Sequence, residues 1–120
     1  MTAEHDALRE SLKLLAGKEA RFAELLADDL RRSHPDVLDG RESLPGPAVK
    51  AALERFSVTT GEGDPAESPG EDVVQLADSL MKVFARVLGR AAWKPAMALA
   101  WNAALRRDGE TLLEELRGLD

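Results

Sequence analysis

Residues 71–89 carry apolar side chains around more than half of a helical circumference. One wide face contains Val73, Leu76, Ala77, Leu80, Phe84, Val87 and Leu88. Val74, Met81 and Val83 form a second apolar face. A helix that is this apolar has to pack against two neighbours or against a partner chain. The segment therefore predicts a helical domain built around residues 71–89.

Other segments repeat apolar residues with the helical period of about 3.6. Helices are expected at 3–16, 18–32 and 48–56, and from Pro95 onwards. Gly17 ends the first, and Pro35 ends the second because proline disfavours helical geometry in the residue before it. No run of useful length alternates apolar and polar residues, so no β-sheet is expected. The prediction is one all-α domain over residues 1–120.

Residues 57–72 are expected to form a flexible loop between two of these helices. The segment is rich in glycine, proline, serine and acidic residues. It has almost no apolar side chain to bury, so little would hold it in one conformation.

Composition excludes several kinds of chemistry and partner. The absence of cysteine removes disulfides, thiolate zinc sites and cysteine nucleophiles, and it fits a cytoplasmic location. A net charge of −6 disfavours nucleic acid as a partner. Membrane association is not expected, because no run approaches the roughly 20 apolar residues of a membrane span.

No residue pattern predicts an enzyme, a metal site or a cofactor. No serine lies in Gly-x-Ser-x-Gly, and the Glu-x-x-His pattern of di-iron bundles is absent. His34 is the best candidate ligand on its chemistry, but its position before Pro35 favours a turn or capping role. Trp93 and Trp101 could line a pocket, although packing is the simpler interpretation.

Five motifs follow one another in the second half of the chain: Ser68-Pro69-Gly70-Glu71, Leu76-Ala77-Asp78-Ser79-Leu80, Val87-Leu88-Gly89, Trp93-Lys94-Pro95 and Trp101. In these motifs the chain resembles bacterial single-domain haemoglobins and flavohaemoglobins of the globin superfamily. The first half agrees through Leu8-Arg9-Glu10-Ser11, the segment 22–30 and His34-Pro35-Asp36-Val37-Leu38. It implies a shortened globin-like helical fold with the last two long helices intact.

The departures from the globin pattern imply that the domain is haem-free. The proximal histidine of the family would align near Gly63, and no histidine follows His34. Globin haem iron needs an imidazole on that side. The segment between Pro35 and Ser68 is also too short for two full pocket helices. An unusual haem ligand such as His34 or Lys50 is the alternative.

Two functions of different class follow. The first is a non-catalytic regulatory or protein-interaction module that binds another protein and, as sensor globins do, forms a homodimer through its last two helices. Its expected interface comprises Val74, Met81, Trp93, Met97 and Trp101. The second is a sensor that binds a small apolar ligand, such as a fatty acid, where haem would lie. Its expected pocket comprises Phe22, Leu26, Phe56, Leu80 and Phe84.

Overall fold

The computed structural model describes residues 3–59, 70–89 and 109–119, with side chains described for residues 9–56, 70–89 and 109–119. The helices are α1 (Ala3–Leu14), α2 (Glu19–Ser33), α3 (Pro35–Leu38), α4 (Gly46–Thr59) and α5 (Glu71–Leu88). Residues 109–117 form a further helical segment. These ranges contain no strand, which confirms the all-α prediction. None of the described helices is long and apolar enough to cross a membrane.

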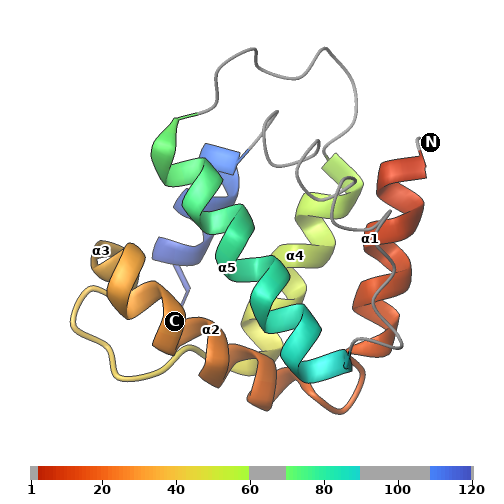
Figure 1. Cartoon of the computed structure of the whole chain (residues 1–120), viewed down its shortest axis with the longest axis horizontal. Helices are drawn as coiled ribbons and strands as arrows, with labels where there is room; N and C mark the ends of the chain where they lie inside the picture. The colour runs from red at the N-terminus through yellow and green to blue at the C-terminus, as the bar shows by residue number, and fades with distance from the viewer. Residues whose placement is uncertain (1–2, 60–69, 90–108, 120) are drawn as a thin grey trace.

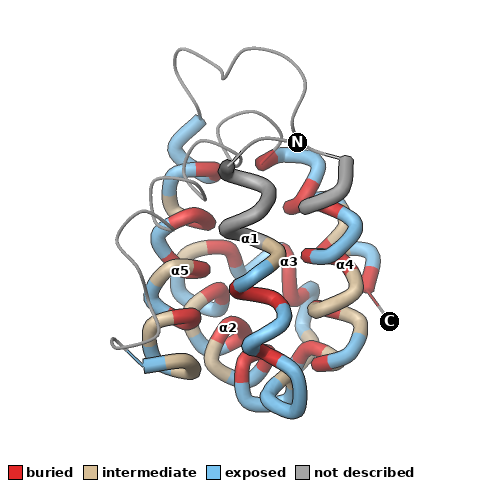
Figure 2. The backbone as a smooth tube through the Cα atoms, turned by 90° about the vertical axis from the view of Figure 1, so that its right-hand side faces the viewer, coloured by how far each residue is buried: buried red, intermediate tan, exposed pale blue. Residues whose placement is uncertain are grey.

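α2 packs against three other helices. It packs against α3, α4 and α5, and α1 packs against α4 (Figure 1). Buried residues recur along α2 at Phe22, Ala23, Leu26, Ala27 and Leu30, which is the spacing of one helical face. Figure 2 shows the result, with buried and exposed stretches alternating along each helix.

A single hydrophobic core joins all the described elements. Its members are Leu12, Leu15, Phe22, Ala23, Leu26, Ala27, Leu30, Val37, Leu38, Leu44, Val49, Ala52, Leu53, Phe56, Val73, Leu76, Ala77, Leu80, Val83, Phe84, Leu112, Leu113, Leu116 and Leu119. Full burial of a side chain as large as leucine or phenylalanine stabilises a fold by about 1.5–3 kcal/mol. This core is the main source of stability.

Several helix ends follow the local sequence signals. Gly17 has a φ of 81°, which glycine adopts readily, and α1 ends before it. The backbone N–H of His34 donates to the Leu30 carbonyl at the end of α2, and Pro35 then begins α3. Gly89 closes α5 with a φ of 81° and donates its N–H to the Ala85 carbonyl.

The middle of the chain is more helical than expected. Residues 35–38 form α3, a helix that the sequence analysis did not expect. α4 runs from Gly46 to Thr59 instead of 48–56. Residues 57–59 of the expected loop belong to α4, so the expectation was wrong at that end. Residues 71–72, which the expected helix over 71–89 also contained, belong to α5. Residues 60–69 lie outside the described ranges.

The N-termini of α2 and α4 meet at close range. A Cβ atom built on Gly46 would lie 2.8 Å from the backbone carbon of Glu19, so only glycine fits there. The Lys50 ammonium of α4 lies 3.6 Å from the Glu19 carboxylate of α2. The pKa of Glu19 is lowered, chiefly by the N–H of its own backbone and also by Lys50.

Candidate functional site

The expected apolar pocket residues meet one another inside the core. Phe22 and Leu26 come from α2, Phe56 from α4, and Leu80 and Phe84 from α5, and each is at most 2% exposed. The rings of Phe22 and Phe84 are 4.7 Å apart between centroids and inclined by 56°, a favourable aromatic contact. The structure thus unites the five residues, but as packed members of the core.

Two of the five expected interface residues lie in described parts of the chain. Val74 of α5 is 52% exposed, whereas Met81 of the same helix is half-buried. Trp93, Met97 and Trp101 lie outside the described residues. Val74 and Met81 are seven residues apart, so they project from the same side of α5.

The solvent-facing side of α5 has charges in a definite order. Its exposed acidic residues Glu71, Asp72 and Asp78 precede its exposed basic residues Lys82 and Arg86. The Lys82 ammonium lies 2.6 Å from the Asp78 carboxylate one turn earlier. Hydrogen bonding to Asp78 raises the pKa of Lys82.

Two adjoining surface hollows follow the boundary between α2 and α5. One, of about 530 Å³, is lined by Asp29, Arg32, Ser33, Val74, Gln75, Asp78, Ser79 and Lys82. The other, of about 340 Å³, is lined by Asp29, Lys82, Val83, Ala85 and Arg86. Because they share Asp29 and Lys82, they form one shallow groove beside the charged side of α5.

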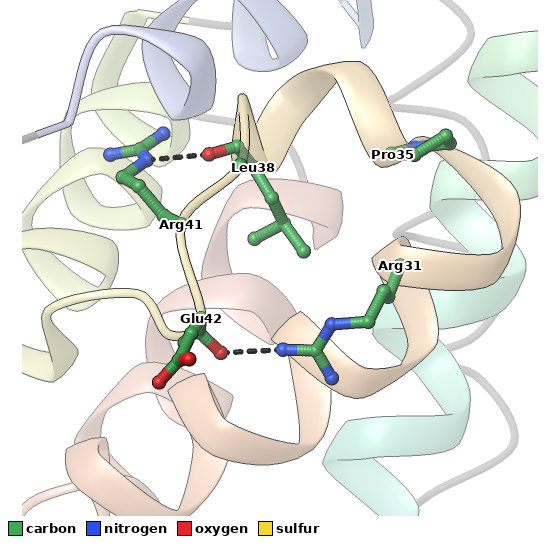
Figure 3. Close-up of a pocket in the computed structure, with 6 residues that line it drawn as sticks. Arg31, Pro35, Leu38, Arg41 and Glu42 are labelled. Carbon is green, nitrogen blue, oxygen red and sulfur yellow. Dashed lines mark hydrogen bonds between the residues drawn. The ribbon is translucent and has the colours of Figure 1, made fainter.

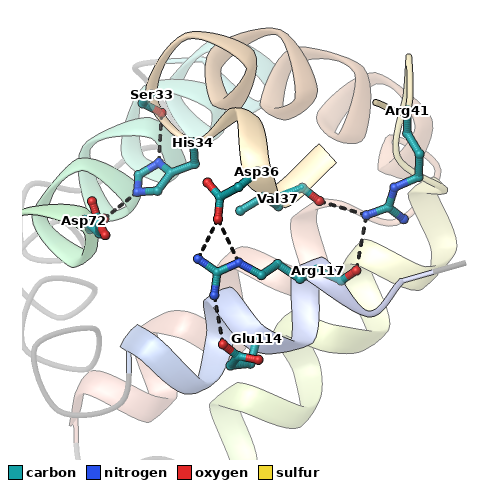
Figure 4. A network of polar contacts seen from close by, with 8 residues as sticks. All are labelled: Ser33, His34, Asp36, Val37, Arg41, Asp72, Glu114 and Arg117. Carbon is teal, nitrogen blue, oxygen red and sulfur yellow. Dashed lines mark hydrogen bonds and ion pairs between the residues drawn. The ribbon is translucent and has the colours of Figure 1, made fainter. Parts of the chain in front are cut away.

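His34 connects the end of α2 to the start of α5. The side chain is only 2% exposed. Its Nε2 lies 2.8 Å from the Asp72 carbonyl oxygen and must donate, because a carbonyl only accepts (Figure 4). Its Nδ1 lies 3.0 Å from the Ser33 hydroxyl. Both ring nitrogens are therefore engaged, in agreement with a structural role at the turn.

An ionic cluster joins α3 to the C-terminal helical segment. The Arg117 guanidinium lies 2.8 Å from Asp36 and 2.9 Å from Glu114. The hydrogen bond from Arg117 lowers the pKa of Asp36, and the same bond raises the pKa of Arg117. Asp36 is 61% exposed, so water screens the pair.

Arg41 binds the carbonyl groups at two helix ends. Its guanidinium donates to Val37 and Leu38 at the end of α3, in each case at 2.9 Å. It also donates to Leu116, Arg117 and Leu119 at the end of the 109–117 segment. Figure 4 draws its bonds to Val37 and Arg117. The last carbonyls of a helix have no partner within it, so one side chain caps both ends.

A surface hollow of about 640 Å³ lies beside α3. Arg31, Pro35, Leu38, Gly40, Arg41 and Glu42 line it (Figure 3). Arg31 already pairs with Asp28 and donates to the Glu42 carbonyl, and Arg41 is engaged as described. Both cations of the hollow thus bind protein oxygens.

Sequence reasoning missed the cluster of Asp36, Arg41 and Arg117. Asp36 and Arg117 are 81 positions apart, and helical periodicity relates only nearby residues. The one local signal was the acidic Asp36 directly after Pro35, in the first turn of a helix.

The described residues contain no group of three or more histidine, cysteine, aspartate or glutamate side chains that could hold a metal ion. In the comparisons with known proteins, no family model, no curated protein and no solved structure matches this chain.

Proposed function

We propose that this chain is a non-catalytic, haem-free helical module that acts by binding protein, and that it forms a homodimer through α5 and its last helix. The observation that carries the proposal is the contrast between the two sides of α5. Leu76, Leu80 and Phe84 are completely buried, whereas Val74 on the other side is 52% exposed. In the proposed dimer, the exposed Val74 and the half-buried Met81 supply the apolar contact on this side of α5.

The start of the last helix lies against α5. A Cβ atom built on Gly109 would lie 2.4 Å from Cγ1 of Val73, so the Gly109 backbone contacts the Val73 side chain. This contact supports a proposal in which the two helices act together.

The residues near the expected haem site do not fit a haem. His34 uses both ring nitrogens within the protein, and iron ligation would break one of those hydrogen bonds. Phe22, Phe56 and Phe84 are at most 2% exposed and pack in the core. The same packing makes the sensor for a small apolar ligand the less supported alternative, because such a ligand would have to displace core contacts.

The globin-like relationship is part of the proposal. In its support, α2 ends at Ser33, directly before the His34-Pro35 segment of the resemblance, and α5 begins at Glu71, where the resemblance also starts a helix.

Haemin titration combined with light scattering on a sizing column tests the proposal. We expect no sharp Soret band and a mass twice the chain mass of 13.0 kDa. A Soret band at one haem per chain would refute the haem-free part. His34→Ala is then the informative variant, because it would abolish that band if His34 were the ligand. A monomeric mass at all concentrations would refute the homodimer.

A further inference from the structure

The solvent-facing side of α5 carries a stripe with the spacing of a coiled-coil seam. Val74, Asp78, Met81 and Ala85 follow one another at intervals of four, three and four residues. Alternating intervals of three and four keep side chains on one side of a helix and form the contact line of paired helices. Val74 and Asp78 are exposed, and Met81 and Ala85 are half-buried. The stripe thus mixes apolar contact area with a charge at its centre.

The order of charges on this side favours one orientation of a matching helix. Asp78 precedes Lys82, and the same sign order holds from Glu71 to Arg86 over the whole helix. A second α5 in parallel orientation would oppose Asp78 with Asp78 and Lys82 with Lys82. An antiparallel α5 would oppose each acidic half with a basic half. Opposite charges across an interface favour association, and like charges suppress it.

We propose that this side of α5 binds the same side of α5 in a second copy of the chain, in antiparallel orientation. Asp78 of each copy then lies beside Lys82 of the other, and Val74 lies at the level of Ala85 and Arg86. This inference rests on the proposed homodimer and specifies its register. The contact is isologous, which is the usual arrangement of a dimer with two-fold symmetry.

The geometry of the Asp78–Lys82 pair suits this register. The two side chains are 55% and 62% exposed and already bind each other at 2.6 Å, so both are held at the surface. In the antiparallel dimer the two pairs form a ring of four charges of alternating sign. The two-fold axis then passes at the level of Leu80, midway between the two residues of each pair.

Charge reversal at either position tests the register on the full-length chain. The variants Asp78→Lys and Lys82→Asp each lose the pair within α5 and each place four like charges in the ring. We expect the dimer Kd of each variant to rise by roughly tenfold or more, measured by sedimentation over a dilution series. An equal mixture of the two should form a heterodimer with a Kd near that of the original chain. The mixture restores opposite charges between chains but not within either one.

Two controls separate register from fold. The double variant Asp78→Lys with Lys82→Asp should dimerise like the original chain. Glu10→Lys breaks an exposed pair with Lys13, 3.2 Å apart, on α1 and should leave the Kd within about twofold. If neither single reversal changes the dimer Kd, or if the mixture fails to associate, the antiparallel register is refuted. The homodimer itself is not refuted by either result. A monomeric original chain would overturn the homodimer itself.

Discussion

Gly109 lies against Val73 of α5, and this contact determines how Gly109→Ala should affect stability. A new Cβ atom would be 2.4 Å, 3.0 Å and 3.2 Å from Cγ1, Cγ2 and Cβ of Val73. Rotation of the valine side chain moves its methyl groups but leaves its Cβ in place, so the crowding persists. Overpacking of this kind costs about 1–3 kcal/mol.

Helix propensity acts in the opposite direction. Alanine is favoured over glycine within a helix by up to about 1 kcal/mol. By sequence alone, Gly109→Ala would therefore stabilise the chain. With the contact to Val73 included, we expect a net destabilisation of about 1–2 kcal/mol and a fall in Tm of roughly 4–8 °C.

Urea denaturation followed by circular dichroism provides the assay, with Gly109→Ala, Val73→Ala and their combination compared. Val73 is buried, so its own truncation should cost about 1–3 kcal/mol. The combination should be more stable than the sum of the two effects by about 1 kcal/mol or more, since the smaller side chain makes room. Gly70→Ala is the matched control, because a Cβ there meets nothing within 4 Å. A stabilising Gly109→Ala, or strictly additive effects, would refute the close contact between the last helix and α5.

The polar cluster gives two further expectations. Arg41→Ala should lower the free energy of unfolding by about 2–3 kcal/mol because carbonyls at two helix ends lose a charged donor, and Arg41→Lys should recover less than half. Urea denaturation measures both, and a lysine variant as stable as the original chain would contradict the double-cap geometry. Arg117 lowers the carboxyl pKa of Asp36 below its usual 3.8. The stability that the ionised Asp36 contributes is therefore complete above pH 3.8 and is lost as pH falls through the lowered pKa. The original chain should therefore be more stable than Asp36→Asn at pH 6, and this difference should shrink as pH falls below 3.8. A difference in stability that does not change with pH would count against the pair.

Local chemistry allowed most helix boundaries to be predicted. Gly17, Pro35 and Gly89 each act within a residue or two of their own position, through φ angles and the loss of a backbone donor. α3 was missed because four residues are too few to show a helical period. The C-terminal part of α4 was missed because the polar residues after Phe56 suggested a loop.

The site was harder to predict because burial and cavity formation are different properties. Helical spacing identified Phe22, Leu80 and Phe84 as residues on inward faces, and all three are buried. Spacing on one helix says nothing of how closely another helix approaches it. Whether these side chains surround a void or fill it depends on the placement of α2 against α5, which tertiary packing decides.

A count of the apolar residues of α5 did not identify which of them are exposed. The sequence analysis grouped Val74 with Val83 as one second face, but nine residues at about 100° each place them about 180° apart. Val83 is only 1% exposed and belongs to the core, whereas Val74 is 52% exposed. The apolar surface left outside is thus a narrow stripe through Val74 and Met81. In the proposed dimer, a stripe of this width gives little selectivity by area alone, and the order of Asp78 and Lys82 along it would specify the direction of the partner helix.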